Sequence, residues 1–171
     1  MNTKGFTLVE LIVTIVLVGI IGTFTTLFLY TGLSGYLRAR DTAEGALKAQ
    51  IALDRISLEL RDINAISAFN ASPDPNPSID YTSTTLPGQR RIRYDSTNNE
   101  IFIRIGGVGG DENLLLDGVR SFAMTPNYAD LNYYSIGGNV VEAINVLFTV
   151  GEINRQFSTQ IFPRNMVPEP P

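Results

Sequence analysis

The feature that most constrains this chain is a run of residues without any charge, from Leu11 to Leu37. As an α-helix these residues rise by about 40 Å, more than the roughly 30 Å of a bilayer's hydrocarbon core. The run is rich in Ile, Leu, Val and Phe and contains no proline. It therefore predicts one membrane-spanning helix. Lys4 and the chain amine favour a cytoplasmic amino terminus, with Arg38 and all that follows on the far side.

A secretory signal peptide is the main alternative for such a segment. Signal peptides have a shorter apolar core, of about 7–15 residues, followed by a small-residue cleavage site. Here the apolar run is longer, and no Ala-x-Ala-like sequence closes it. The sequence therefore favours a retained anchor.

One acidic residue, Glu10, stands at the head of the apolar run. An acidic side chain inside a membrane costs several kcal/mol unless something compensates it, so such residues are taken as functional by default. The alternative is that Glu10 lies in the headgroup zone and extends into water. Sequence physics leaves both interpretations open.

The segment from Gly5 to Glu10, which reads GFTLVE and follows Lys4, resembles the N-terminal signature of type IV prepilins and type II secretion pseudopilins. The resemblance implies that a prepilin peptidase removes residues 1–5 by cutting after Gly5 and that the new amino terminus, Phe6, is methylated. It also implies that Glu10 pairs with the N-terminal amine of a neighbouring subunit. Such a pair is stronger in a low-dielectric bundle than in water.

The same resemblance implies partners and a location. The expected partners are other pilin or pseudopilin subunits, the prepilin peptidase, an inner-membrane assembly platform and membrane lipid. The expected location is the inner membrane, with one span and a periplasmic C-terminal domain that later joins an extracytoplasmic filament.

The subclass rests on weaker similarities. The segments 52–61, 116–119 and 162–165 resemble those of minor pilins or J-type minor pseudopilins. The chain has no cysteine, so it cannot form the disulfide with which many major pilins close their last loop. The implied function is a minor structural subunit. The alternatives are a major pilin and an unprocessed single-span periplasmic binding or sensor domain.

Helical spacing continues beyond Leu37 to about Ser67. Apolar residues recur every three or four positions and predict one buried helical stripe. They are Ala39, Ala43, Ala46, Ala49, Leu53, Ile56, Leu60 and Ile63. The prediction is one helix from Phe6 to Ser67, with residues 6–37 in the membrane or filament core and residues 38–68 as an amphipathic periplasmic half. Two pairs spaced four residues apart, Glu44–Lys48 and Arg55–Glu59, are expected on exposed flanks.

A second, thinner apolar set lies nearly opposite the first stripe and comprises Leu47, Ile51, Leu58 and Ala65. We expect Leu47, Ile51 and Leu58 to form a face that contacts neighbouring helices in a filament. The alternative is that the folded domain wraps both sides of the helix.

Residues 69–171 are expected to form a globular β-rich domain. Residues 69–88 are rich in Pro, Ser, Asn and Asp and predict a long loop, and residues 166–171 predict a loose tail. Short strands are expected at residues 91–94, 101–105, 114–116, 119–124, 140–150 and 156–162. The sequence thus predicts an α+β fold with an antiparallel sheet packed on the second half of the helix.

The composition argues against catalysis and against nucleic-acid binding. The chain has no His and no Cys, its formal net charge is −4, and no segment carries a basic run. The glycine-rich residues 106–110 lack the Lys and Ser/Thr of a phosphate loop and predict a turn. Asp111, Glu112 and Asp117 match no calcium loop and are expected to be solvated surface acids. We therefore predict no enzyme activity, no catalytic residue, no metal site and no cofactor.

Overall fold

The structure is a computed structural model that describes residues 5–107, 109–128, 141–151 and 153–164. Lys4 with most of the predicted leader, the segment around Tyr134 and the predicted tail lie outside these residues. The chain divides into two compact units, Met1–Ala43 and Glu44–Pro171, which are considered separately.

The first unit contains the amino-terminal part of helix α1, which runs from Leu8 to Arg61. Its apolar side chains are exposed, and five threonine hydroxyls donate to carbonyl oxygens one turn earlier. These residues are Thr14, Thr23, Thr25, Thr26 and Thr42. Such bonds satisfy the polar groups within the helix itself, as an apolar surrounding requires.

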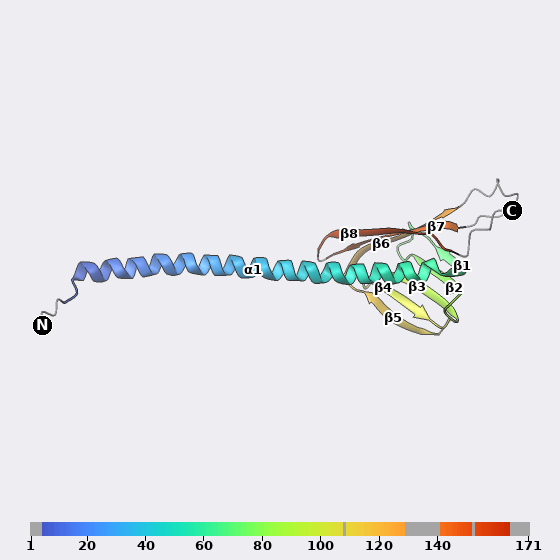
Figure 1. Ribbon diagram of the computed structural model, residues 1–171, viewed down its shortest axis with the longest axis horizontal. Helices are drawn as coiled ribbons and strands as arrows, with labels where there is room; N and C mark the ends of the chain where they lie inside the picture. The colour runs from blue at the N-terminus through green and yellow to red at the C-terminus, as the bar shows by residue number, and fades with distance from the viewer. Residues whose placement is uncertain (1–4, 108, 129–140, 152, 165–171) are drawn as a thin grey trace. The chain divides into compact units, whose positions relative to one another are not determined.

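The second unit combines the last turns of α1 with two antiparallel sheets (Figure 1). One sheet has the order β1-β2-β3-β4-β5 and the other has the order β6-β7-β8. The strands are β1 (Ile63–Asn70), β2 (Ser78–Ser83), β3 (Gln89–Asp95), β4 (Glu100–Ile105), β5 (Asp111–Leu116), β6 (Val119–Tyr128), β7 (Val141–Val150) and β8 (Arg155–Ile161). This confirms the predicted α+β class, with the β-structure divided between two sheets instead of one.

The core of the second unit forms where one face of α1 meets both sheets. The helix contributes buried Ala49, Ala52, Leu53, Ile56 and Leu60. The five-stranded sheet adds Ile79, Tyr81 and Ile92, and the three-stranded sheet adds Ile144, Val146 and Phe148. The predicted stripe is thus buried from Ala49 onward, whereas Ala39 and Ala43 are exposed and Ala46 is half-buried.

The predicted end of the helix was wrong. The helix ends at Arg61, and residues 63–70 form β1 instead of continuing the helix to Ser67. The helix does not continue past Arg61, because the carboxylate of Asp62 accepts hydrogen bonds from the hydroxyl of Ser83 and the amide of Thr85. Ile63 and Ala65 therefore belong to a strand, and Ala65 is not part of a helical face.

The long loop predicted for residues 69–88 was also wrong. This segment contains β2, which pairs with β1 and β3 and buries Ile79 and Tyr81 completely. The hairpin of β3 and β4 and the antiparallel pair of β7 and β8 are confirmed. Strands β5 and β6 are longer than predicted.

Candidate functional site

The start of α1 is set by a hydrogen bond between Thr7 and Glu10. The amide of Glu10 donates to the Thr7 hydroxyl oxygen over 3.3 Å, and the amide of Leu11 donates to the Thr7 carbonyl over 3.2 Å. A threonine followed three residues later by a glutamate is the sequence of a capping box. Residues 5–7 therefore lie outside the helix.

The predicted processing residues lie in this non-helical segment. Phe6 is 75% exposed, and among the described residues no atom beyond the chain neighbours lies within 4 Å of the position that a Cβ of Gly5 would occupy. The peptide bond after Gly5 is thus outside helical hydrogen bonding and sterically open, as cleavage at this position would require.

Glu10 lies in the first turn of α1 and is exposed, among exposed Val9 and Leu11. Within the described residues its carboxylate has no hydrogen-bond or ion-pair partner. The helix N-terminus favours a negative charge, but by only about 0.3–1 kcal/mol at exposed sites. That is less than the several kcal/mol that an acid costs inside a membrane.

Residues 1–26 match a family described as the prokaryotic N-terminal methylation motif. The chain carries a type IV pilin-like signature. No curated protein and no solved structure matches the chain. The pilin-like helix α1 is long and apolar enough to cross a membrane, and its most apolar stretch is not buried within the protein.

The face of α1 that carries Leu47, Ile51 and Leu58 is not covered by the folded domain. These side chains are 61%, 59% and 62% exposed. Asp54 and Arg61 are also exposed and continue the same spacing of four and three residues. We call Leu47, Ile51, Asp54, Leu58 and Arg61 the open face.

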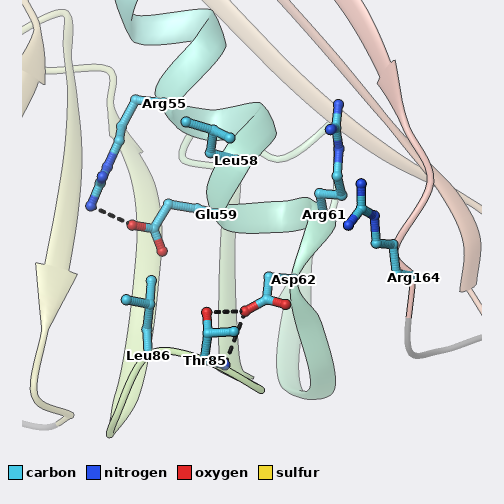
Figure 2. A pocket seen from close by; sticks show the side chains of 8 residues that line it. All are labelled: Arg55, Leu58, Glu59, Arg61, Asp62, Thr85, Leu86 and Arg164. Atoms are coloured by element: carbon cyan, nitrogen blue, oxygen red, sulfur yellow. Dashed lines mark hydrogen bonds and ion pairs between the residues drawn. The ribbon is translucent and has the colours of Figure 1, made fainter.

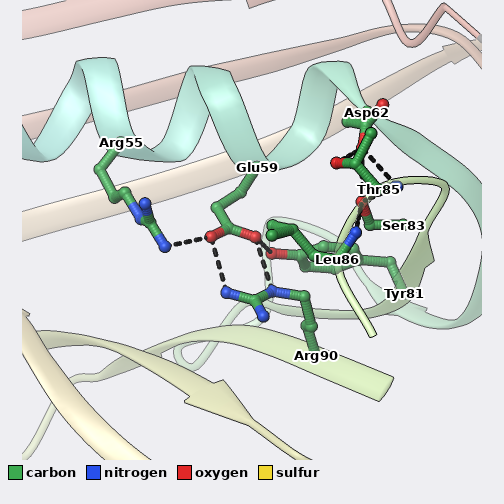
Figure 3. Close-up of polar contacts among 8 residues, drawn as sticks. All are labelled: Arg55, Glu59, Asp62, Tyr81, Ser83, Thr85, Leu86 and Arg90. Atoms are coloured by element: carbon green, nitrogen blue, oxygen red, sulfur yellow. Dashed lines mark hydrogen bonds and ion pairs between the residues drawn. The ribbon is translucent and has the colours of Figure 1, made fainter. Parts of the chain in front are cut away.

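Sequence reasoning missed a buried polar cluster centred on Glu59 (Figure 3). The predicted pair with Arg55 forms at 2.6 Å, but Glu59 is only 2% exposed, so its placement on an exposed flank was wrong. Arg90 donates to both oxygens of the Glu59 carboxylate at 2.7 Å, and the Tyr81 hydroxyl donates at 2.8 Å. The spacing gave a weak indication that Glu59 is buried, because it follows Ile56 of the predicted buried stripe by three residues.

The electrostatics of this cluster favour the charged pair. Burial raises the pKa of the Tyr81 hydroxyl far above its usual range, and the Glu59 charge raises it further. Burial alone would lower the pKa of Arg90, but the hydrogen bonds and charge of Glu59 raise it overall. Tyr81 and Arg90 thus remain protonated donors to Glu59, and the cluster joins α1 to β2 and β3.

A hollow of about 370 Å³, which we call the basic hollow, opens beside the end of α1 (Figure 2). It is lined by Arg55, Leu58, Glu59, Arg61, Asp62, Thr85, Leu86 and Arg164. A second hollow of about 330 Å³ lies between the helix end and β8 and shares Arg61 and Arg164 with the first. The two arginines therefore lie between the two hollows.

No group of three His, Cys, Asp or Glu residues could hold a metal ion in the part of the chain that is described. Glu112, one of the acids considered for calcium, is bound by Arg93 at 2.7 and 2.9 Å on the outer face of the five-stranded sheet. These bonds lower the pKa of Glu112.

Proposed function

We propose that this chain is a structural subunit, of the minor kind, of a type IV pilus or type II secretion pseudopilus. The observation that supports this proposal most directly is that the methylation motif of residues 1–26 contains an exposed carboxylate, that of Glu10, at the start of an exposed apolar helix. An apolar helix with an uncompensated acid requires partners outside the chain, and a bundle of identical or related helices supplies them.

The proposed mechanism is assembly. The prepilin peptidase cuts after Gly5 and the new amino terminus at Phe6 is methylated. The Phe6 amine then pairs with Glu10 of a neighbouring subunit. Because the pair lies in a low-dielectric bundle, leaving either partner alone is costly, so the contact favours one position of each incoming subunit.

The remaining parts of the proposal concern location and neighbours. The periplasmic half of the helix, residues 38–68, and the globular domain that follows lie in the periplasm, held by the single span, and later on the filament. Leu47, Ile51 and Leu58 contact neighbouring subunits, which their exposure supports. The absence of cysteine supports the minor subclass. An inner-membrane assembly platform is the expected further partner.

Mass spectrometry of the N-terminal peptide tests the processing step. The full chain is expressed with an active prepilin peptidase and extracted from membranes. The expected product begins at N-methylated Phe6. In Gly5→Val the branched side chain obstructs the cleavage position, so the chain should keep Met1.

A matched control is Gly19→Val, the same substitution at a glycine that also has open space around it but lies within α1. This variant should be processed like the unaltered chain. If the unaltered chain keeps Met1 beside an active peptidase, the proposal fails and an unprocessed periplasmic binding or sensor domain becomes the better explanation.

A further inference from the structure

The open face has the spacing of a helix–helix seam. Its five members follow one another at intervals of four, three, four and three residues, which is the heptad pattern of packed helices. Leu47, Ile51 and Leu58 supply apolar contacts, whereas Asp54 and Arg61 put one acid and one base on the same seam, seven residues apart. Asp54 accepts a hydrogen bond from Gln50 at 3.0 Å but forms no ion pair among the described residues.

Arg61 and Arg164 form a neighbouring pair of positive charges at the C-terminal end of this seam. The amide of Arg164 donates to the carbonyl of Arg61 over 3.0 Å. Both side chains line the basic hollow (Figure 2), and both also line the second hollow beside β8. Within the described part of the chain neither guanidinium lies within ion-pair distance of an acid. Two adjacent like charges repel each other, and an external carboxylate would relieve that repulsion.

The two acids that line the basic hollow, Glu59 and Asp62, are already occupied. Glu59 is bound by Arg55, Arg90 and Tyr81. Asp62 accepts from Ser83 and Thr85, and although the charge of Arg164 contributes to lowering its pKa, its hydrogen bonds have the larger effect. The basic hollow therefore presents positive charge beside the apolar side chains of Leu58 and Leu86, which suits a carboxylate that has apolar neighbours.

We propose that Asp54 of a second copy of this chain binds at Arg61 and Arg164, with the two helices parallel and displaced by seven residues. This inference rests on the proposed function, which orients all copies in the same direction. Displacement by seven residues, about 10 Å along a helix, also places Ile51 of the second copy opposite Leu58 of the first. Apolar then meets apolar, and acid meets base.

The unshifted arrangement is disfavoured by charge. Two parallel helices in register would put Asp54 opposite Asp54 and Arg61 opposite Arg61, and like charges in facing positions are destabilising. The shifted arrangement leaves one Asp54 and one arginine pair unused at its two ends.

Cysteine cross-linking tests this arrangement cleanly, because the chain contains no cysteine of its own. Two differently tagged full-length forms, one with Ile51→Cys and the other with Leu58→Cys, are co-expressed in membranes with the prepilin peptidase and treated with a short bifunctional maleimide. The expected main product joins position 51 to position 58. Cells that carry only one cysteine form should give at least about fivefold less dimer.

Charge reversal identifies the contact. Asp54→Arg alone and Arg61→Asp alone should each reduce the 51–58 product about fivefold, which corresponds to the upper range measured for exposed ion pairs. The double variant in the same chain should restore part of it, because the charges at positions 54 and 61 are then exchanged between the two copies while Arg164 keeps its charge. Glu142→Arg, an equal change at an exposed acid on β7, should have no effect.

Three outcomes would overturn the inference: main products at 51–51 and 58–58, cross-links only to a different protein, or loss of product in the charge variants without restoration in the double variant. The N-terminal mass separates this failure from that of the proposed function. Methylated Phe6 without a 51–58 product defeats only the shifted contact, whereas an intact Met1 defeats the function on which it rests.

Discussion

Glu10 and Glu59 are both acids of helix α1 that stand among apolar residues, yet they differ in burial and in hydrogen-bond partners. Glu59 is 2% exposed and receives hydrogen bonds or ion pairs from Arg55, Arg90 and Tyr81. Glu10 is exposed, and among the described residues its carboxylate has no partner. The charge of Glu59 is therefore compensated by folding, and we propose that the charge of Glu10 is compensated by assembly.

This contrast distinguishes two roles of a charge that stands among apolar residues. A charge whose partners belong to the same chain affects the free energy of unfolding of that chain. A charge whose partner belongs to another chain leaves unfolding almost unchanged and affects association. The same substitution at the two positions should therefore give different results.

The largest effect on stability is expected for Glu59→Gln. Removing this charge leaves Arg90, which is 4% exposed, without its full counter-charge, and breaking a buried pair in this way costs about 3–5 kcal/mol. Urea unfolding of the full chain in detergent, followed by near-UV circular dichroism of the tyrosines, measures the loss. Glu10→Gln should change the same unfolding free energy by less than about 0.5 kcal/mol.

Glu44→Gln is the matched control for Glu59→Gln. Glu44 forms an ion pair with Lys48 at 3.2 Å with the same four-residue spacing as Arg55–Glu59, but both side chains are more than half exposed. Its removal should cost no more than about 0.5 kcal/mol. Equal losses for Glu44→Gln and Glu59→Gln would show that burial does not distinguish the two pairs.

A smaller effect is expected for Tyr81→Phe. The phenylalanine keeps the ring in the core, but Glu59 loses one of its hydrogen bonds, so the unfolding free energy should fall by about 1.5–3 kcal/mol. Tyr94→Phe removes a bond from a tyrosine hydroxyl to the neutral carbonyl of Val119 and should cost about 1 kcal/mol. The reverse order in urea unfolding would contradict a charged Glu59.

The smallest effect concerns pH. Hydrogen bonds from Ser83 and Thr85 lower the pKa of Asp62 below its value in the unfolded chain. The stabilisation is therefore fully present above the unfolded pKa of about 4 and is lost as the pH falls through the lower, folded pKa. The urea midpoint should fall in acid, and Asp62→Asn should flatten this dependence. Ser83→Ala should reproduce part of the change, and an unchanged slope in both variants would contradict the assignment.

The local sequence pattern was sufficient to predict those features that depend on residues close together in the chain. The uncharged run, the glycine-to-glutamate signature and the hairpin of β3 and β4 could all be predicted, because each depends on residues close in sequence. The exposure of Leu47, Ile51 and Leu58 agrees with the expectation that this face is available for contacts. That neighbouring subunits occupy it stays a prediction.

The errors share a physical cause, which is dependence on partners distant in sequence. The helix stops at Arg61 because Asp62 bonds to Ser83 and Thr85, more than twenty residues away. Strand β2 is too short and polar to stand out, but it pairs with a strand on each side. Glu59 looked like a surface acid until Arg90 and Tyr81 were placed beside it.

The most direct test of the central claim is the recovery of Glu10→Gln in the filament fraction of cells that contain the peptidase and the assembly machinery. The account predicts that this variant is cut after Gly5, keeps the unfolding free energy of the unaltered chain, and yet enters filaments at least about tenfold less. Incorporation equal to that of the unaltered chain would show that the Glu10 carboxylate does not guide assembly, and would contradict the account.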